Sequence, residues 1–269
     1  MSKLVKRAWA VFKAYFISEM TRSRGFIYGL LSFAIWITLM ITPLMLFAEP
    51  GRDPRSISGY IFTGIIMFMF YTSATWDWAA ELRWMINDGR LEYYIASGSG
   101  FLPHFLGILP ISLIWLAIAL LVNYAVLSII LGPPLLLFQE PYLLIAGFSL
   151  LLINLVGYAL ILGGSMIASG TSGFIVEILG FILPVATGGL TPLSVLPKPL
   201  QLFALITPFS YPAELIRYSL IATQPVLPLN TLFIRGSIYS LVFLSIGILF
   251  FKYQLKKIMK EGFRATSMW

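Results

Sequence analysis

Two carboxylates border long apolar runs in this sequence, and their surroundings decide what chemistry they can do. Asp77 lies between Trp76 and Trp78, and Glu177 follows Gly173 by four residues. An ionised carboxylate in the centre of a bilayer costs about 3 kcal/mol or more, so such residues are functional candidates. Tryptophan is enriched where a membrane meets water, and a helix N-terminus favours an anion. We therefore expect both carboxylates at the membrane interface, with direct contact to a substrate as the open alternative.

A second charged pair occurs further along the chain. Glu214 and Arg217 are three residues apart, so they share one face of a helix and are predicted to form an ion pair. A structural role for the helix that carries them is one interpretation, and a direct part in the protein's activity is the other.

A possible nucleophile is Ser172, in the stretch Gly170-Thr171-Ser172-Gly173. This stretch resembles the Gly-x-Ser-Gly segment of rhomboid intramembrane proteases, whose chemistry requires a histidine base next to the serine. The chain has one histidine, His104, which begins a different apolar run. Because glycine and serine are ordinary turn residues, we interpret the stretch as a turn. We predict that the chain is not an enzyme and binds no metal or cofactor of its own.

Charged and aromatic residues are concentrated between 81 and 100. Arginine and buried aromatic residues dominate the energy of protein interfaces, so we predict a docking segment for another protein, with an ordinary solvated loop as the alternative. The candidate contact residues are Glu81, Arg83, Trp84, Asp88, Arg90, Leu91, Glu92 and Tyr93.

The composition identifies the solvent around these residues. Of 269 residues, 59% are hydrophobic and 11% are charged, whereas soluble domains are about 25% charged. Apolar surface on this scale requires lipid. The sequence therefore predicts an all-α polytopic membrane protein.

The distribution of Lys and Arg predicts the orientation. The segments 1–24 and 252–269 contain six and five of the 18 basic residues. Because basic residues next to spans stay on the cytoplasmic side, we predict a protein of the cell membrane with both termini in the cytoplasm. The same distribution argues against nucleic-acid binding. With the segment 81–100, the cytoplasmic side has thirteen basic residues and the outer side has five.

The apolar runs predict the elements. Residues 3–20, within the segment 1–24, have apolar residues at helical spacing among lysines, which is typical of an amphipathic helix lying in the membrane interface. Residues 25–269 then form a single domain of six transmembrane helices, since about 20 apolar residues cross a bilayer. The predicted spans are 26–48, 59–80, 104–131, 142–168, a fifth from 174 that breaks at Pro184 and Gly188-Gly189, and 232–251.

The segment 190–231 is too apolar for an aqueous loop, and its seven prolines prevent one straight helix. Broken helices at membrane depth occur where protein buries them, so we predict a re-entrant pair of short helices between spans 5 and 6.

Two stretches resemble the permeases of ABC-2-type transporters. Gly89-Arg90-Leu91-Glu92 is similar to the Gly-x-Leu-Glu stretch that follows the second span in that family, and residues 188–217 are similar to its pattern after the fifth span. The second pattern is carried by Pro192, Leu193, Ser194, Leu196, Pro197, Pro208, Ser210, Tyr211, Glu214 and Arg217.

The resemblance implies an exporter subunit that moves a hydrophobic or amphipathic substrate, such as a drug or lipid, outward. It implies partnership with two ATPase subunits, which would bind ATP and Mg²⁺, and with a second copy or a paralogue of this permease. The chain contains no Gly-x-x-x-x-Gly-Lys-(Ser/Thr) phosphate loop, which agrees with ATP hydrolysis in another chain. A non-transport assembly or sensor subunit with the same fold is the alternative.

The same resemblance implies three sets of site residues. Residues 81–96 would form a coupling helix that sits on the ATPase, and 190–231 would form an outer gate with Pro192, Pro197, Pro208, Tyr211, Glu214 and Arg217. The candidate pathway lining is Phe62, Met67, Phe68, Phe70, Tyr71 and Phe181.

Overall fold

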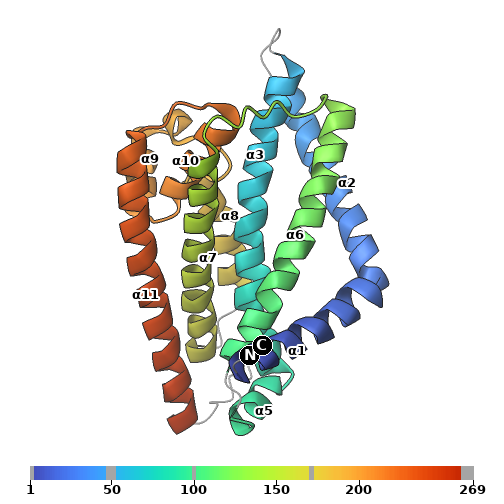
Figure 1. Ribbon diagram of the computed structural model, residues 1–269, viewed down its shortest axis with the longest axis vertical. Helices are drawn as coiled ribbons and strands as arrows, with labels where there is room; N and C mark the ends of the chain where they lie inside the picture. The colour runs from blue at the N-terminus through green and yellow to red at the C-terminus, as the bar shows by residue number, and fades with distance from the viewer. Residues whose placement is uncertain (1–2, 47–52, 99–100, 170–172, 262–269) are drawn as a thin grey trace. The chain divides into compact units, whose positions relative to one another are not determined.

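The computed structural model describes residues 3–46, 53–98, 101–169 and 173–261, and its regular elements in these ranges are helices (Figure 1). Four of the described helices are long and apolar enough to cross a membrane. This confirms the all-helical prediction and indicates a multi-pass membrane protein. The four candidate spans are Pro54–Ile86, Leu102–Ile130, Pro141–Met166 and Leu229–Lys260.

The chain divides into two compact units, Met1–Ile66 with Gly98–Leu136, and Met67–Ser97 with Leu137–Trp269. The first unit contains α1 (Lys3–Tyr15), the π-helical turn η1 (Phe16–Thr21), α2 (Arg24–Leu46), the start of α3 (Pro54–Thr72) and α6 (Leu102–Ile130). The second contains the end of α3, the π-helix η2 (Ser73–Ala79), α4 (Ala80–Asn87), α5 (Arg90–Ala96), α7 (Pro141–Ser169), α8 (Gly173–Ala186), the 3₁₀ turn η3 (Leu193–Val195), α9 (Lys198–Ile206), α10 (Ser210–Ile221) and α11 (Leu229–Glu261).

In the first unit, the amphipathic helix α1 is attached to α6 at Gly107. A Cβ atom at Gly107 would lie 2.7 Å from the Ala8 carbonyl oxygen and 2.7 Å from the Val11 Cβ, so the two helices meet backbone to backbone. One turn away, the buried His104 ring makes an edge contact with Tyr15, at 5.6 Å between ring centroids. His104 is thus a buried residue that packs against an aromatic ring at the start of α6.

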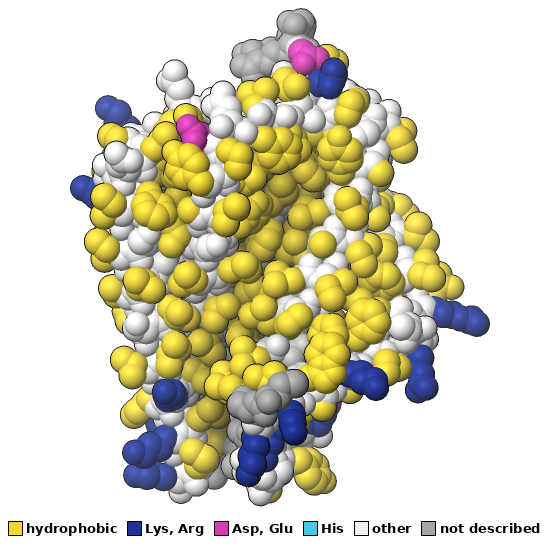
Figure 2. All heavy atoms as spheres, in the orientation of Figure 1, with side chains coloured by type: hydrophobic (Ala, Val, Ile, Leu, Met, Phe, Trp, Pro, Cys, Tyr) yellow, Lys and Arg dark blue, Asp and Glu magenta, His cyan; other side chains and the backbone are white. Residues whose placement is uncertain are grey.

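In the second unit, α7 and α11 run parallel and side by side (Figure 1). A Cβ at Gly247 would lie 2.6 Å from the Gly157 carbonyl oxygen, so the helix axes approach as closely as glycine allows. The opposite side of α11 is exposed and hydrophobic over most of its length, and exposed lysines follow from Lys252 onward (Figure 2). That change from apolar residues to lysines is typical of a span that leaves the membrane on its cytoplasmic side.

Two predicted boundaries are wrong. Span 2 does not end at residue 80, because α3, η2 and α4 form one uninterrupted helix, so the segment 81–100 is largely helical. The break comes at Gly89, whose φ of +68° favours glycine, and α5 follows it. Pro184 does not end α8, which continues to Ala186.

Two predicted spans and the re-entrant pair are not decided by these elements. α2 and α8 occupy the positions of spans 1 and 5, and α8 has 14 residues, fewer than the ~20 that cross a bilayer. The predicted pair of short helices corresponds to α9 and α10. Their depth in a membrane stays a prediction.

Candidate functional site

The segment after α8 is held by the side chain of Arg217 on α10. Its Nη1 and Nη2 atoms donate to the carbonyl oxygens of Gly188 and Gly189, each at 2.5 Å, and the residue is 1% exposed. Gly188 has a φ of +77°, so the chain reverses sharply there and turns two consecutive carbonyls toward the guanidinium. The planar guanidinium of arginine, with its several N–H groups, suits such a double acceptor.

Glu214, one turn earlier on α10, holds two other loops. One carboxylate oxygen accepts from the backbone N–H of Leu193 at 3.2 Å, and the other accepts from that of Val226 at 3.1 Å. Burial raises the pKa of Glu214 above its ordinary value, while these two hydrogen bonds and the charge of Arg217 lower it. We call Glu214, Arg217 and the four backbone groups they bind the outer bracket.

The outer bracket modifies the predicted Glu214–Arg217 pair. Each side chain directs hydrogen bonds to loop backbone, and the positive charge of Arg217 lowers the pKa of Glu214. A structural role for this helix therefore accounts for both residues. The local i, i+3 spacing identified the residues and missed their backbone partners.

Neighbouring side chains fasten the rest of the segment 187–228. The Tyr71 hydroxyl on α3 lies 3.0 Å from the Thr187 hydroxyl, and Asn154 on α7 donates to the Pro208 carbonyl at 2.7 Å. Tyr211 donates to the Leu205 carbonyl at 2.6 Å. Of the predicted gate prolines, Pro192 and Pro208 are buried and Pro197 is exposed.

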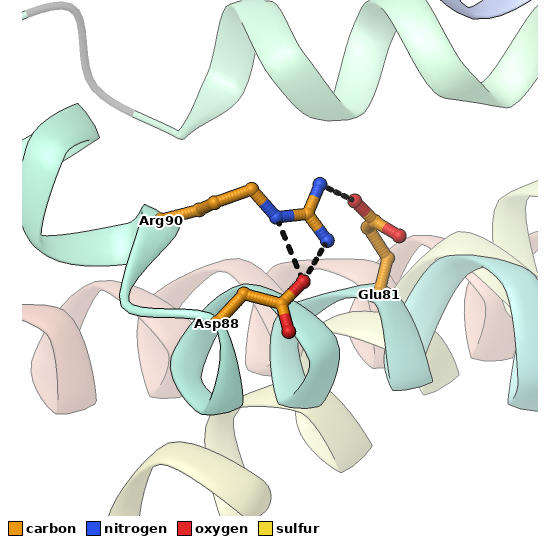
Figure 3. A network of polar contacts seen from close by, with 3 residues as sticks. All are labelled: Glu81, Asp88 and Arg90. Atoms are coloured by element: carbon orange, nitrogen blue, oxygen red, sulfur yellow. Dashed lines mark hydrogen bonds and ion pairs between the residues drawn. The ribbon is translucent and has the colours of Figure 1, made fainter. Parts of the chain in front are cut away.

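At the other end of α3–η2–α4, a turn joins α4 to α5. Arg90, the first residue of α5, contacts Asp88 through Nη2 at 2.9 Å and Nε at 3.1 Å, and it approaches Glu81 on α4 at 3.6 Å (Figure 3). Burial raises the pKa of the neighbouring Tyr94. We call α4, α5 and this turn the elbow.

The elbow sorts the predicted contact residues into two groups. Leu91 is 1% exposed and anchors α5, and Arg83 and Glu81 are half-buried. By contrast, Trp84 is 56% exposed, Tyr93 is 77% exposed, and Glu92 beside it is exposed too. Two exposed aromatic side chains on short helices form a surface suited to docking.

Most of the predicted pathway lining is buried within the chain. Met67 and Tyr71 have no exposed surface, Phe62 and Phe70 are buried, and Phe68 is half-buried. Asp77 is exposed within η2, whereas the side chains of Glu177 and Phe181 lie outside the described part of the structure, as does Ser172. Whether any of these residues touches a substrate stays a prediction.

Several residues escaped the sequence reasoning. Asn154 and Thr75 are single polar residues in apolar helices and have no pattern that marks them. Gly188 and Gly189 were recognised only as a break, although their carbonyls are what Arg217 binds.

Comparison with known proteins identifies no relative: no family model matches the chain, and no curated protein matches it significantly.

Proposed function

We propose that this chain is the membrane-spanning permease subunit of an ATP-driven exporter of the ABC-2 type. In this proposal it has six spans, with α2 and α8 completing the four long helices, and it places α9 and α10 as a re-entrant pair at the outer face. It works in the cell membrane with two ATPase subunits and a second permease, and it moves a hydrophobic or amphipathic substrate outward.

The observation that supports the proposal most directly is the connection between α3 and the elbow. A candidate span continues as helix, without a loop, into a surface with exposed Trp84, Glu92 and Tyr93. A helix transmits displacement along its axis far better than a flexible loop does. An ATPase bound to the elbow would therefore push or tilt α3 directly.

The outer bracket supports the second half of the mechanism. It joins the end of α8, α10 and the loop before α11 through buried polar contacts, so these parts move together. A rigid cap at the outer end and a docking surface at the other end fit a pathway that opens when the spans tilt. The non-transport alternative gains no specific support from the geometry.

Co-purification in detergent tests the proposal. Glu92→Ala with Tyr93→Ala removes the most exposed part of the elbow, and we expect loss of ATPase association or uncoupled hydrolysis while membrane insertion is unchanged. The matched control is Lys252→Ala with Tyr253→Ala, a charged and aromatic neighbour pair exposed on α11. An unaltered chain that binds no ATPase, or equal effects of both double variants, would count against the proposal.

A further inference from the structure

The helix that leads to the elbow contains a π-helical segment, η2, between α3 and α4. The cap of this segment shows its register: the backbone N–H of Ala80 donates to the Thr75 carbonyl, five residues earlier. An α-helix bonds four residues back, so a π segment accommodates one surplus residue without breaking the rod. Such segments are rare and are frequently found at functional sites.

The side chain of Thr75 ties η2 to α7. Its hydroxyl donates to the Tyr71 carbonyl at 2.9 Å, and its oxygen lies 3.2 Å from the Tyr158 hydroxyl on α7. The bond to Tyr71 is compatible with either register, because a carbonyl oxygen can accept a side-chain and a backbone donor together. The contact with Tyr158 is therefore the one that fixes Thr75 in its present position.

Glycines face η2 and α4 where they pack on α7 and α8. Gly180 on α8 faces Thr75 and Trp76, where a Cβ would lie 3.3 Å from the Trp76 Nε1 atom, and a Cβ at Gly163 on α7 would clash with the Leu82 Cδ1 atom. The Trp78 Nε1 group is buried without a hydrogen-bond partner in the described structure. The present register is thus closely packed at the glycines and leaves one buried donor unsatisfied.

We propose that η2 is a register switch between the candidate span and the elbow. Conversion from π to α extends the rod by one residue, which advances α4 by about 1.5 Å and rotates it by about 100°. Glu81 then takes the place of Leu82 opposite Gly163. The role of the switch rests on the proposed function, in which an ATPase binds the elbow. The existence of the two registers does not depend on any partner.

Deletions test the surplus residue without any partner. The chain has no cysteine, so Leu82→Cys with Gly163→Cys reports the register through a short thiol crosslinker. Deleting Ala74 alone removes the surplus residue, and we expect the crosslink and membrane insertion to survive. Deleting Ser73 and Ala74 together removes one residue too many, and we expect the crosslink to be lost. Loss of the crosslink in both deletion variants would overturn the switch.

A full-length variant covers the case in which the deletion variant does not fold. Thr75→Val keeps the side-chain volume and removes the hydroxyl contact with Tyr158 on α7, so it releases the residue that fixes the present register. We expect the yield of the Glu81→Cys/Gly163→Cys crosslink to rise and that of the Leu82→Cys/Gly163→Cys crosslink to fall. An unchanged ratio of the two yields would overturn the switch. If the chain binds no ATPase, the proposed function is wrong, but the crosslinking experiments still test the register switch.

Discussion

The outer bracket and the elbow are both built on one arginine close to carboxylates, and they differ in burial. Arg217 and Glu214 are 1% and 2% exposed, and their hydrogen-bond partners are backbone groups of loops. At the elbow, the Arg90 and Asp88 side chains are 41% and 53% exposed, so water and salt compete for every contact. Buried charges that bind backbone fix a chain path, whereas exposed ion pairs orient a surface and can exchange partners.

The largest expected effect comes from breaking the outer bracket. Arg217→Met removes the donors to Gly188 and Gly189 and leaves the Glu214 carboxylate without its neighbouring charge. We expect a loss of about 3–5 kcal/mol, which abolishes or sharply lowers the yield of folded protein. Thermal unfolding in detergent measures it, with the exposed Lys198→Met as the matched control. Equal midpoints for the two variants would show that the bracket does not hold the fold.

A smaller effect is expected from Glu214→Gln. Glutamine has one carbonyl oxygen where glutamate has two, so either Leu193 or Val226 loses its acceptor. We expect about 1–3 kcal/mol of destabilisation, with the protein still folded. If the bracket closes the outer end, basal ATPase activity of the complex should rise. If the variant is destabilised but the basal ATPase activity of the complex is unchanged, the outer bracket has no part in gating.

The smallest effect on stability is expected at the elbow. Arg90→Gln removes contacts that are largely exposed, so the unfolding midpoint should change by less than about 1 kcal/mol in equivalent free energy. Association with the ATPase should nevertheless weaken, because α5 loses its fixed orientation on α4. Thermal unfolding measures the first effect, and titration with the ATPase at low and high salt measures the second. A variant that binds the ATPase as tightly as the unaltered chain at both salt concentrations would remove Arg90 from the docking surface.

The long helices were predictable because lipid imposes a simple rule on apolar runs. The ends of α6 and α7 lie within two residues of their predicted positions. The Glu214–Arg217 spacing is local and could be recognised in the sequence. Their partners Gly188, Leu193 and Val226 lie in separate loops. These partners bind through backbone groups, which every residue type has, so the sequence does not reveal them. The surplus residue in η2 was hidden for the same reason: Ser73 to Ala79 read as any other helical stretch.

The parallel contact between α7 and α11 has a consequence for biosynthesis. Gly157 and Gly247 meet backbone to backbone, yet they are about 90 residues apart along the chain. At about 5–20 residues synthesised per second, the glycine face of α7 waits roughly 5–20 s for its partner. During that interval the glycine strip of α7 is uncovered, although η2 and α10, which also pack on α7, are already synthesised. The second unit thus completes its core only when the last span leaves the ribosome, and a stalled or truncated chain exposes the strip to chaperones and proteases.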